Sequence, residues 1–147
     1  MPVKKTHREQ VKALATGDAS RANELNEAMP DSERQAFNRY LSAVFAILLE
    51  HRFKDNLSRD AIAAFANEMV HDYEDTDIQI KPLTIEGVIR AASGEHQLAD
   101  ELSGEDILST KFLVIGKIVM HDPEVSANLD GFLDEAEQLV DDWEHEE

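Results

Sequence analysis

The sequence predicts an all-α protein, a compact bundle of about six or seven helices in a single domain over residues 1–147. Two observations lead to this prediction. Apolar residues recur every three or four positions through most of the chain, which is the period of an amphipathic helix. Ser, Thr or Asp stands just before most of these segments, where helix N-caps occur. With 42% hydrophobic residues, a chain of this size can bury a core of its own.

The first two helices are predicted from their start and stop signals. Thr6 and Glu9 have the spacing of a capping box, and Gly17 follows the last apolar position of the first helix. A short second helix is predicted over about 18–29, because Pro30 cannot continue it.

The third helix is the longest in the N-terminal half, with Asp31 or Ser32 as its cap and an end near Phe53. Its apolar face is predicted from a turn of about 100° per residue. That face contains Phe37, Tyr40, Leu41, Val44, Leu48 and His51.

Ser58 is the predicted cap of the fourth helix, with Leu57 and Ile62 at the spacing of a hydrophobic staple. The predicted buried positions are Ile62, Phe65, Ala66, Met69 and Tyr73. Residues 75–81 are predicted to be irregular, because Pro82 disfavours helix at the residue before it.

Thr84 is predicted to cap the next helix, with Leu83 and Val88 as a second staple pair. A short helical turn at about 96–101 is then expected to lead to Ser103, the cap of a further helix.

The segment 107–120 is apolar around most of its circumference, so it is expected to be buried on all sides, by its own chain or by a second subunit. The sequence therefore predicts a homodimer, with this segment as either the central helix of each chain or the dimer seam. The residues assigned to this core or dimer seam are Phe112, Val114, Ile115, Ile118 and Val119.

Asp122 and Pro123 are predicted to begin an acidic C-terminal helix over about 123–145. Its apolar face contains Val125, Leu129, Phe132, Leu133, Ala136, Leu139, Val140 and Trp143. Its opposite face contains four carboxylates, predicted to be the face that binds a partner: Asp130, Asp134, Glu137 and Asp141.

The net charge of −17 is distributed unevenly along the sequence. Residues 1–59 contain 10 Lys+Arg against 8 Asp+Glu, including a basic N-terminal arm at about 1–12, whereas residues 60–147 contain 4 against 23. Such an acidic surface repels nucleic acid and anionic membranes, so direct binding to either is not expected. It suits a protein partner that is itself basic.

These observations predict a non-enzymatic interaction or regulatory module, such as an inhibitor or immunity-type partner of a basic protein. One alternative is a DNA mimic that antagonises a DNA-binding protein. Another is a small-ligand-binding or enzymatic bundle, with a pocket near His51 or Lys111. No nucleotide-binding loop or nucleophile elbow is present, so no catalytic residue or cofactor is expected.

An imperfect calcium loop is the best motif match in the chain. Its ligand positions would be Ser126, Asn128, Asp130, Gly131, Asp134 and Glu137. Ser126 lacks the usual first carboxylate, and the apolar stripe keeps its helical period through the motif, which favours a plain helix. Glu68 and His71 form a single Glu-x-x-His pair and are expected to face solvent. No metal is therefore predicted.

The sequence gives little evidence on cellular location. It contains no cysteine and no apolar run of about 18 residues, and its basic start is not followed by an apolar stretch. A cytoplasmic location is expected.

Overall fold

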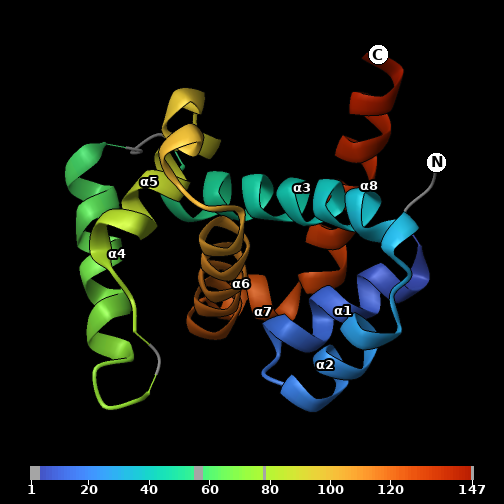
Figure 1. Ribbon diagram of the computed structural model, residues 1–147, viewed down its shortest axis with the longest axis horizontal. Helices are drawn as coiled ribbons and strands as arrows, with labels where there is room; N and C mark the ends of the chain where they lie inside the picture. The colour runs from blue at the N-terminus through green and yellow to red at the C-terminus, as the bar shows by residue number, and fades with distance from the viewer. Residues whose placement is uncertain (1–3, 55–57, 78, 147) are drawn as a thin grey trace. The chain divides into compact units, whose positions relative to one another are not determined.

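The computed structural model describes residues 4–54, 58–77 and 79–146, and within these ranges the chain is helical and contains no β-strand (Figure 1). The all-α prediction is confirmed. Leu57, one half of the first predicted staple, lies outside the described residues, as do the first three residues of the basic arm.

The chain forms two compact units. The first unit combines Met1–Leu48 with Val114–Glu147, and the second is Leu49–Leu113. Both boundaries fall inside long helices, α3 (Arg34–Phe53) and α6 (Gly104–His121), so no linker sequence marks them. The first unit contains 17 Asp+Glu against 8 Lys+Arg, and the second contains 14 against 6. The two units are therefore similarly acidic, because the first joins the basic N-terminus to the acidic C-terminus.

In the first unit, α1 (Lys5–Ala15) and α2 (Ala19–Ala28) form a helical hairpin. The N-cap of α1 is Lys4, and Thr6 lies inside the helix, so the predicted capping box is wrong. Gly17 has a φ of 82°, a left-handed conformation that glycine adopts without strain and that ends α1. Asp18 then caps α2 by accepting a hydrogen bond from the backbone N–H of Arg21, at 3.2 Å.

Helix α3 is preceded by a 3₁₀ turn, η1 (Asp31–Glu33). Of its predicted apolar face, the buried residues are Phe37, Tyr40, Leu41, Val44 and Leu48. Ala43, Phe45 and Leu49 are buried as well. The helix is therefore buried on more sides than a single apolar stripe predicts.

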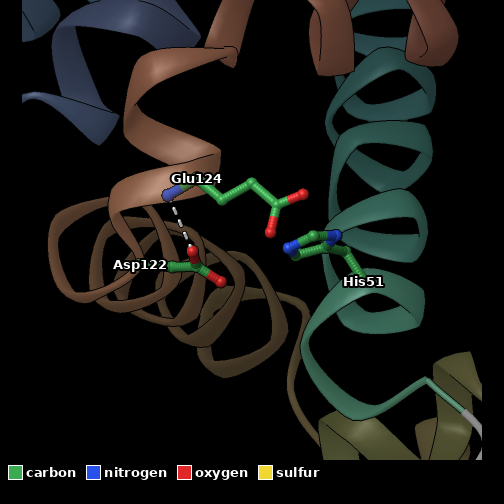
Figure 2. Close-up of side chains that lie close together, drawn as sticks. All are labelled: His51, Asp122 and Glu124. Atoms are coloured by element: carbon green, nitrogen blue, oxygen red, sulfur yellow. Dashed lines mark hydrogen bonds between the residues drawn. The ribbon is translucent and has the colours of Figure 1, made fainter.

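The predicted C-terminal helix is divided into α7 (Pro123–Ala127) and α8 (Leu129–Glu146). Asp122 caps α7 as expected, because its Oδ1 accepts the backbone N–H of Glu124 at 3.0 Å (Figure 2). Asn128 separates the helices, with its side-chain amide donating to the carbonyl of Glu124 at 2.9 Å. Despite this break the apolar face is kept, and its fully buried members are Val125, Leu129, Leu133, Ala136 and Val140.

The second unit begins with α4 (Arg59–Asp72), capped by Ser58, whose Oγ accepts the N–H of Ala61 at 3.1 Å. The next helix, α5 (Pro82–Ala92), begins two residues before the predicted cap, because Pro82 occupies its first position. Leu83 therefore lies within α5 and is 79% exposed, so the second predicted staple is wrong.

A 3₁₀ segment, η2 (His96–Glu101), precedes α6, which Ser103 caps through the N–H of Asp106 at 3.0 Å. Four of the five predicted core or seam residues are buried within this chain: Val114, Ile115, Ile118 and Val119. Phe112 is only half-buried, and Met120 is 67% exposed. Helix α6 is thus not buried all round. Among the described residues, no helix combines the length and apolar character needed to span a bilayer.

Candidate functional site

The candidate site is the acidic face of α8, made of Asp130, Asp134, Glu137 and Asp141. Leu133 and Ala136 are completely buried, and they fix the rotation of α8. The four carboxylates follow one another at helical spacing on the opposite side. Asp130 and Asp134 are 67% and 72% exposed, whereas Glu137 is 33% exposed.

Arg8 of α1 binds three of these four carboxylates. Its Nη1 donates to Oδ1 of Asp134 at 2.7 Å and also to Oε2 of Glu137. Its Nη2 donates to Oδ1 of Asp130 at 3.2 Å and to the backbone carbonyl of that residue at 3.0 Å. The Nζ of Lys12, one turn further along α1, lies 3.0 Å from Oδ1 of Asp130. The acidic face is therefore joined to the basic N-terminal arm inside one unit.

The charges in this cluster stabilise one another. Burial alone would lower the pKa of Arg8, but the hydrogen bonds to the three carboxylates raise it above its ordinary value. The hydrogen bond from Lys12, followed by that from Arg8, lowers the pKa of Asp130. Arg8 and Asp130 are therefore both charged near neutral pH.

Tyr40 of α3 adds a buried hydroxyl beside the cluster. The residue is fully buried, and its hydroxyl has no hydrogen-bond partner among the described residues. Burial, followed by the charge of Glu137, raises its phenol pKa. Sequence reasoning missed Arg8, Lys12 and Tyr40 as neighbours of the acidic face. The available signal was the opposite charge of residues 1–12 and 123–145.

His7 lies next to Arg8 on α1 but faces the interior, with 2% of its side chain exposed. Its Nε2 is 3.2 Å from Oε1 of Glu33, and its ring makes an edge contact with Phe37 at 5.5 Å. Burial lowers the pKa of His7 below the usual value of 6.5, although Glu33 acts in the opposite direction. His7 is therefore neutral at pH 7.

We expect His7 to make stability depend on pH. The unfolded chain takes up a proton on His7 near pH 6.5, and the folded chain does so only at lower pH, so the unfolded state binds more protons in between. The unfolding free energy should therefore fall as the pH drops below about 6.5. Urea unfolding from about pH 7 to about pH 5 should show this slope, and His7→Gln should reduce it. His96→Gln, at an exposed histidine, is the control. An unchanged slope in His7→Gln would contradict the prediction.

The residues of the calcium-loop motif do not form a loop. Asp130, Gly131, Asp134 and Glu137 lie within α8, and the three carboxylates point toward a guanidinium. A cation already lies where a calcium ion would have to bind.

Millimolar calcium is accordingly expected to leave the melting temperature unchanged, because a ligand raises it only by binding the native state. The measurement compares thermal unfolding in calcium chloride and in sodium chloride of equal ionic strength. A rise specific to calcium that Glu137→Gln abolishes would contradict this expectation.

The other candidate residues, Glu68, His71 and His51, belong to the second unit. Glu68 and His71 are both exposed, as predicted, and pair with Arg52 and Glu74 respectively. His51 is half-buried on α3 and belongs to the second unit, whereas Asp122 and Glu124 begin α7 in the first (Figure 2). These three residues are therefore not part of one unit.

Two hollows lie within the second unit. The first, of about 200 Å³, is lined by Gln79, Ile80, Lys81, Thr84, Ile85, Asp106, Ser109, Thr110 and Leu113. The second is a groove of about 300 Å³ between α5 and η2. Lys111 is half-buried on α6, and burial lowers its pKa. Neither Lys111 nor His51 lines either hollow, so the predicted pocket residues are not at these two sites.

The chain matches no protein-family model, no curated protein and no solved structure.

Proposed function

We propose that the chain is a non-enzymatic interaction module whose α8 acidic face binds a basic protein partner. One observation carries the proposal: the face already binds a guanidinium, yet its carboxylates remain exposed to solvent. Asp130 and Asp134 hold Arg8 through Oδ1, yet both side chains are about two-thirds exposed.

The pairing with Arg8 prepares the face for binding. Hydrogen bonds from a partly buried arginine restrict the rotamers of the carboxylates, so a partner loses less side-chain entropy when it binds them. Beyond the reach of Arg8, α8 continues with Asp141 and Asp142, both exposed. These two residues add charge that no Arg or Lys contact in the described residues neutralises.

Electrostatic complementarity mainly increases the association rate and the selection of partners, and salt weakens it. Affinity capture from a lysate of the source organism should therefore recover basic proteins at low salt and lose them at high salt. Capture of the same proteins at both salt concentrations would show a contact that does not depend on the acidic face.

A further inference from the structure

The groove between α5 and η2 is lined by both leucine and glutamate side chains. It is lined by Leu83, Thr84, Glu86, Gly87, Arg90, Leu98, Glu101 and Leu102. Leu83 is 79% exposed, which makes it one of the two most exposed large apolar side chains among the described residues. An exposed apolar anchor beside a concave surface is typical of protein interfaces.

Two local contacts border the groove. Gly87 of α5 lies against the side chain of Leu102, since a Cβ placed at Gly87 would be 3.4 Å from it, at ordinary van der Waals distance. Arg90 then fixes the turn between the two elements by donating two hydrogen bonds to the carboxylate of Glu95, each of 2.7 Å. The groove is therefore formed before any partner binds.

The charge of the groove is negative. Arg90, the one cationic residue of the described lining, pairs with Glu95, which also lies 3.8 Å from Arg59. The lining itself therefore has two carboxylates against one guanidinium. The remaining charged side chains of the lining are Glu86, which is half-buried, and Glu101, which is exposed. The second unit as a whole has 14 acidic against 6 basic residues, so a basic occupant is favoured over an acidic one.

We infer that this groove binds a short basic segment of a protein partner. An apolar side chain of the segment packs on Leu83, Leu98 and Leu102, and flanking Lys or Arg residues face Glu86 and Glu101. A second copy of this chain fits less well, because it would bring a further acidic surface to an acidic groove. This site is separate from the α8 acidic face and does not depend on the function proposed for it.

The test uses fluorescence anisotropy with the full chain and three labelled peptides of equal length. One contains lysine and leucine, one lysine and serine, and one glutamate and leucine. The lysine–leucine peptide should bind most tightly. Leu83→Ser should weaken its binding about tenfold, the loss of one buried apolar anchor. Glu86→Lys with Glu101→Lys should weaken it at least as much.

Three controls make the outcome specific. Met120→Ser removes the other exposed apolar side chain, which lies in the first unit, and should leave the affinity unchanged. Asp75→Lys with Asp77→Lys changes the charge of the second unit equally but away from the groove, and should have a smaller effect. Asp141→Lys with Asp142→Lys alters α8 alone and should also have a smaller effect.

Several results would overturn the inference. Equal binding of the lysine–leucine and lysine–serine peptides would show a purely electrostatic contact. Loss of binding only in the α8 variant would assign the peptide to the α8 acidic face and leave the groove without a role. A wild-type dimer in sedimentation that Leu83→Ser dissociates would show that a second copy occupies the groove.

Discussion

Replacing Ile118 with aspartate is expected to unfold the first unit. Ile118 is 2% exposed and packs in the core of that unit. The change removes a buried isoleucine, worth about 2–5 kcal/mol, and places a carboxylate where it cannot be solvated. The total is comparable with the whole stability of a typical domain, about 5–15 kcal/mol. Circular dichroism and urea unfolding should show loss of the cooperative transition.

Met120→Asp is the matched control, because Met120 lies two residues along α6 and is 67% exposed. Its effect should stay within about 0.5 kcal/mol, as for most surface substitutions. Sedimentation of wild type and both variants separates a core role from a dimer seam. If Ile118→Asp stays folded and only changes a dimer to a monomer, the burial of Ile118 within one chain is contradicted.

Replacing Arg8 with alanine is expected to give the second-largest loss, about 2–3 kcal/mol of unfolding free energy. The variant loses hydrogen bonds to three carboxylates and leaves them close together without their main counter-charge. The value is below that of a fully buried ion pair because Asp130 and Asp134 are largely exposed. Arg8→Lys should restore only part of the stability, since an ammonium cannot reproduce the planar contact.

Arg21→Ala is the control for Arg8→Ala. Arg21 also contacts two carboxylates, Glu9 and Glu24, each at 3.2 Å, but it is 49% exposed. Its loss should cost below about 1 kcal/mol. Added salt should partly restore Arg8→Ala, because it screens the repulsion among the carboxylates. Equal losses in the two variants would mean that the Arg8 cluster is an ordinary surface contact.

The predicted caps Ser58, Ser103 and Asp122 are confirmed, because a cap depends on nearby residues: each accepts a backbone N–H from within three positions. The caps predicted at Thr6 and Thr84 are wrong. The predicted start of α5 is wrong for a local reason as well. Pro82 occupies the first helical position, whereas Thr84, two residues later, has the form of an N-cap. At the break between α7 and α8, the side-chain amide of Asn128 donates to the Glu124 carbonyl, which also accepts the backbone N–H of Asn128.

The Arg8 cluster could not be predicted in the same way. Arg8 and Asp134 lie 126 positions apart, and helical periodicity gives the face of each helix without its neighbour. The division into two units could not be predicted from the sequence either, because its boundaries fall inside continuous helices. Charge alone made the acidic face of α8 a candidate site, but only the fold shows that three of its four carboxylates already bind an arginine.

The central claim is that the α8 acidic face binds a basic partner. The most direct measurement is the affinity of a purified captured partner for wild type, for Asp141→Lys with Asp142→Lys, and for Asp75→Lys with Asp77→Lys. Both variants change the net charge equally, and neither removes a hydrogen bond to Arg8. We expect the α8 variant to bind at least about tenfold more weakly and the control to bind nearly as wild type. Equal affinities for all three proteins would contradict the claim.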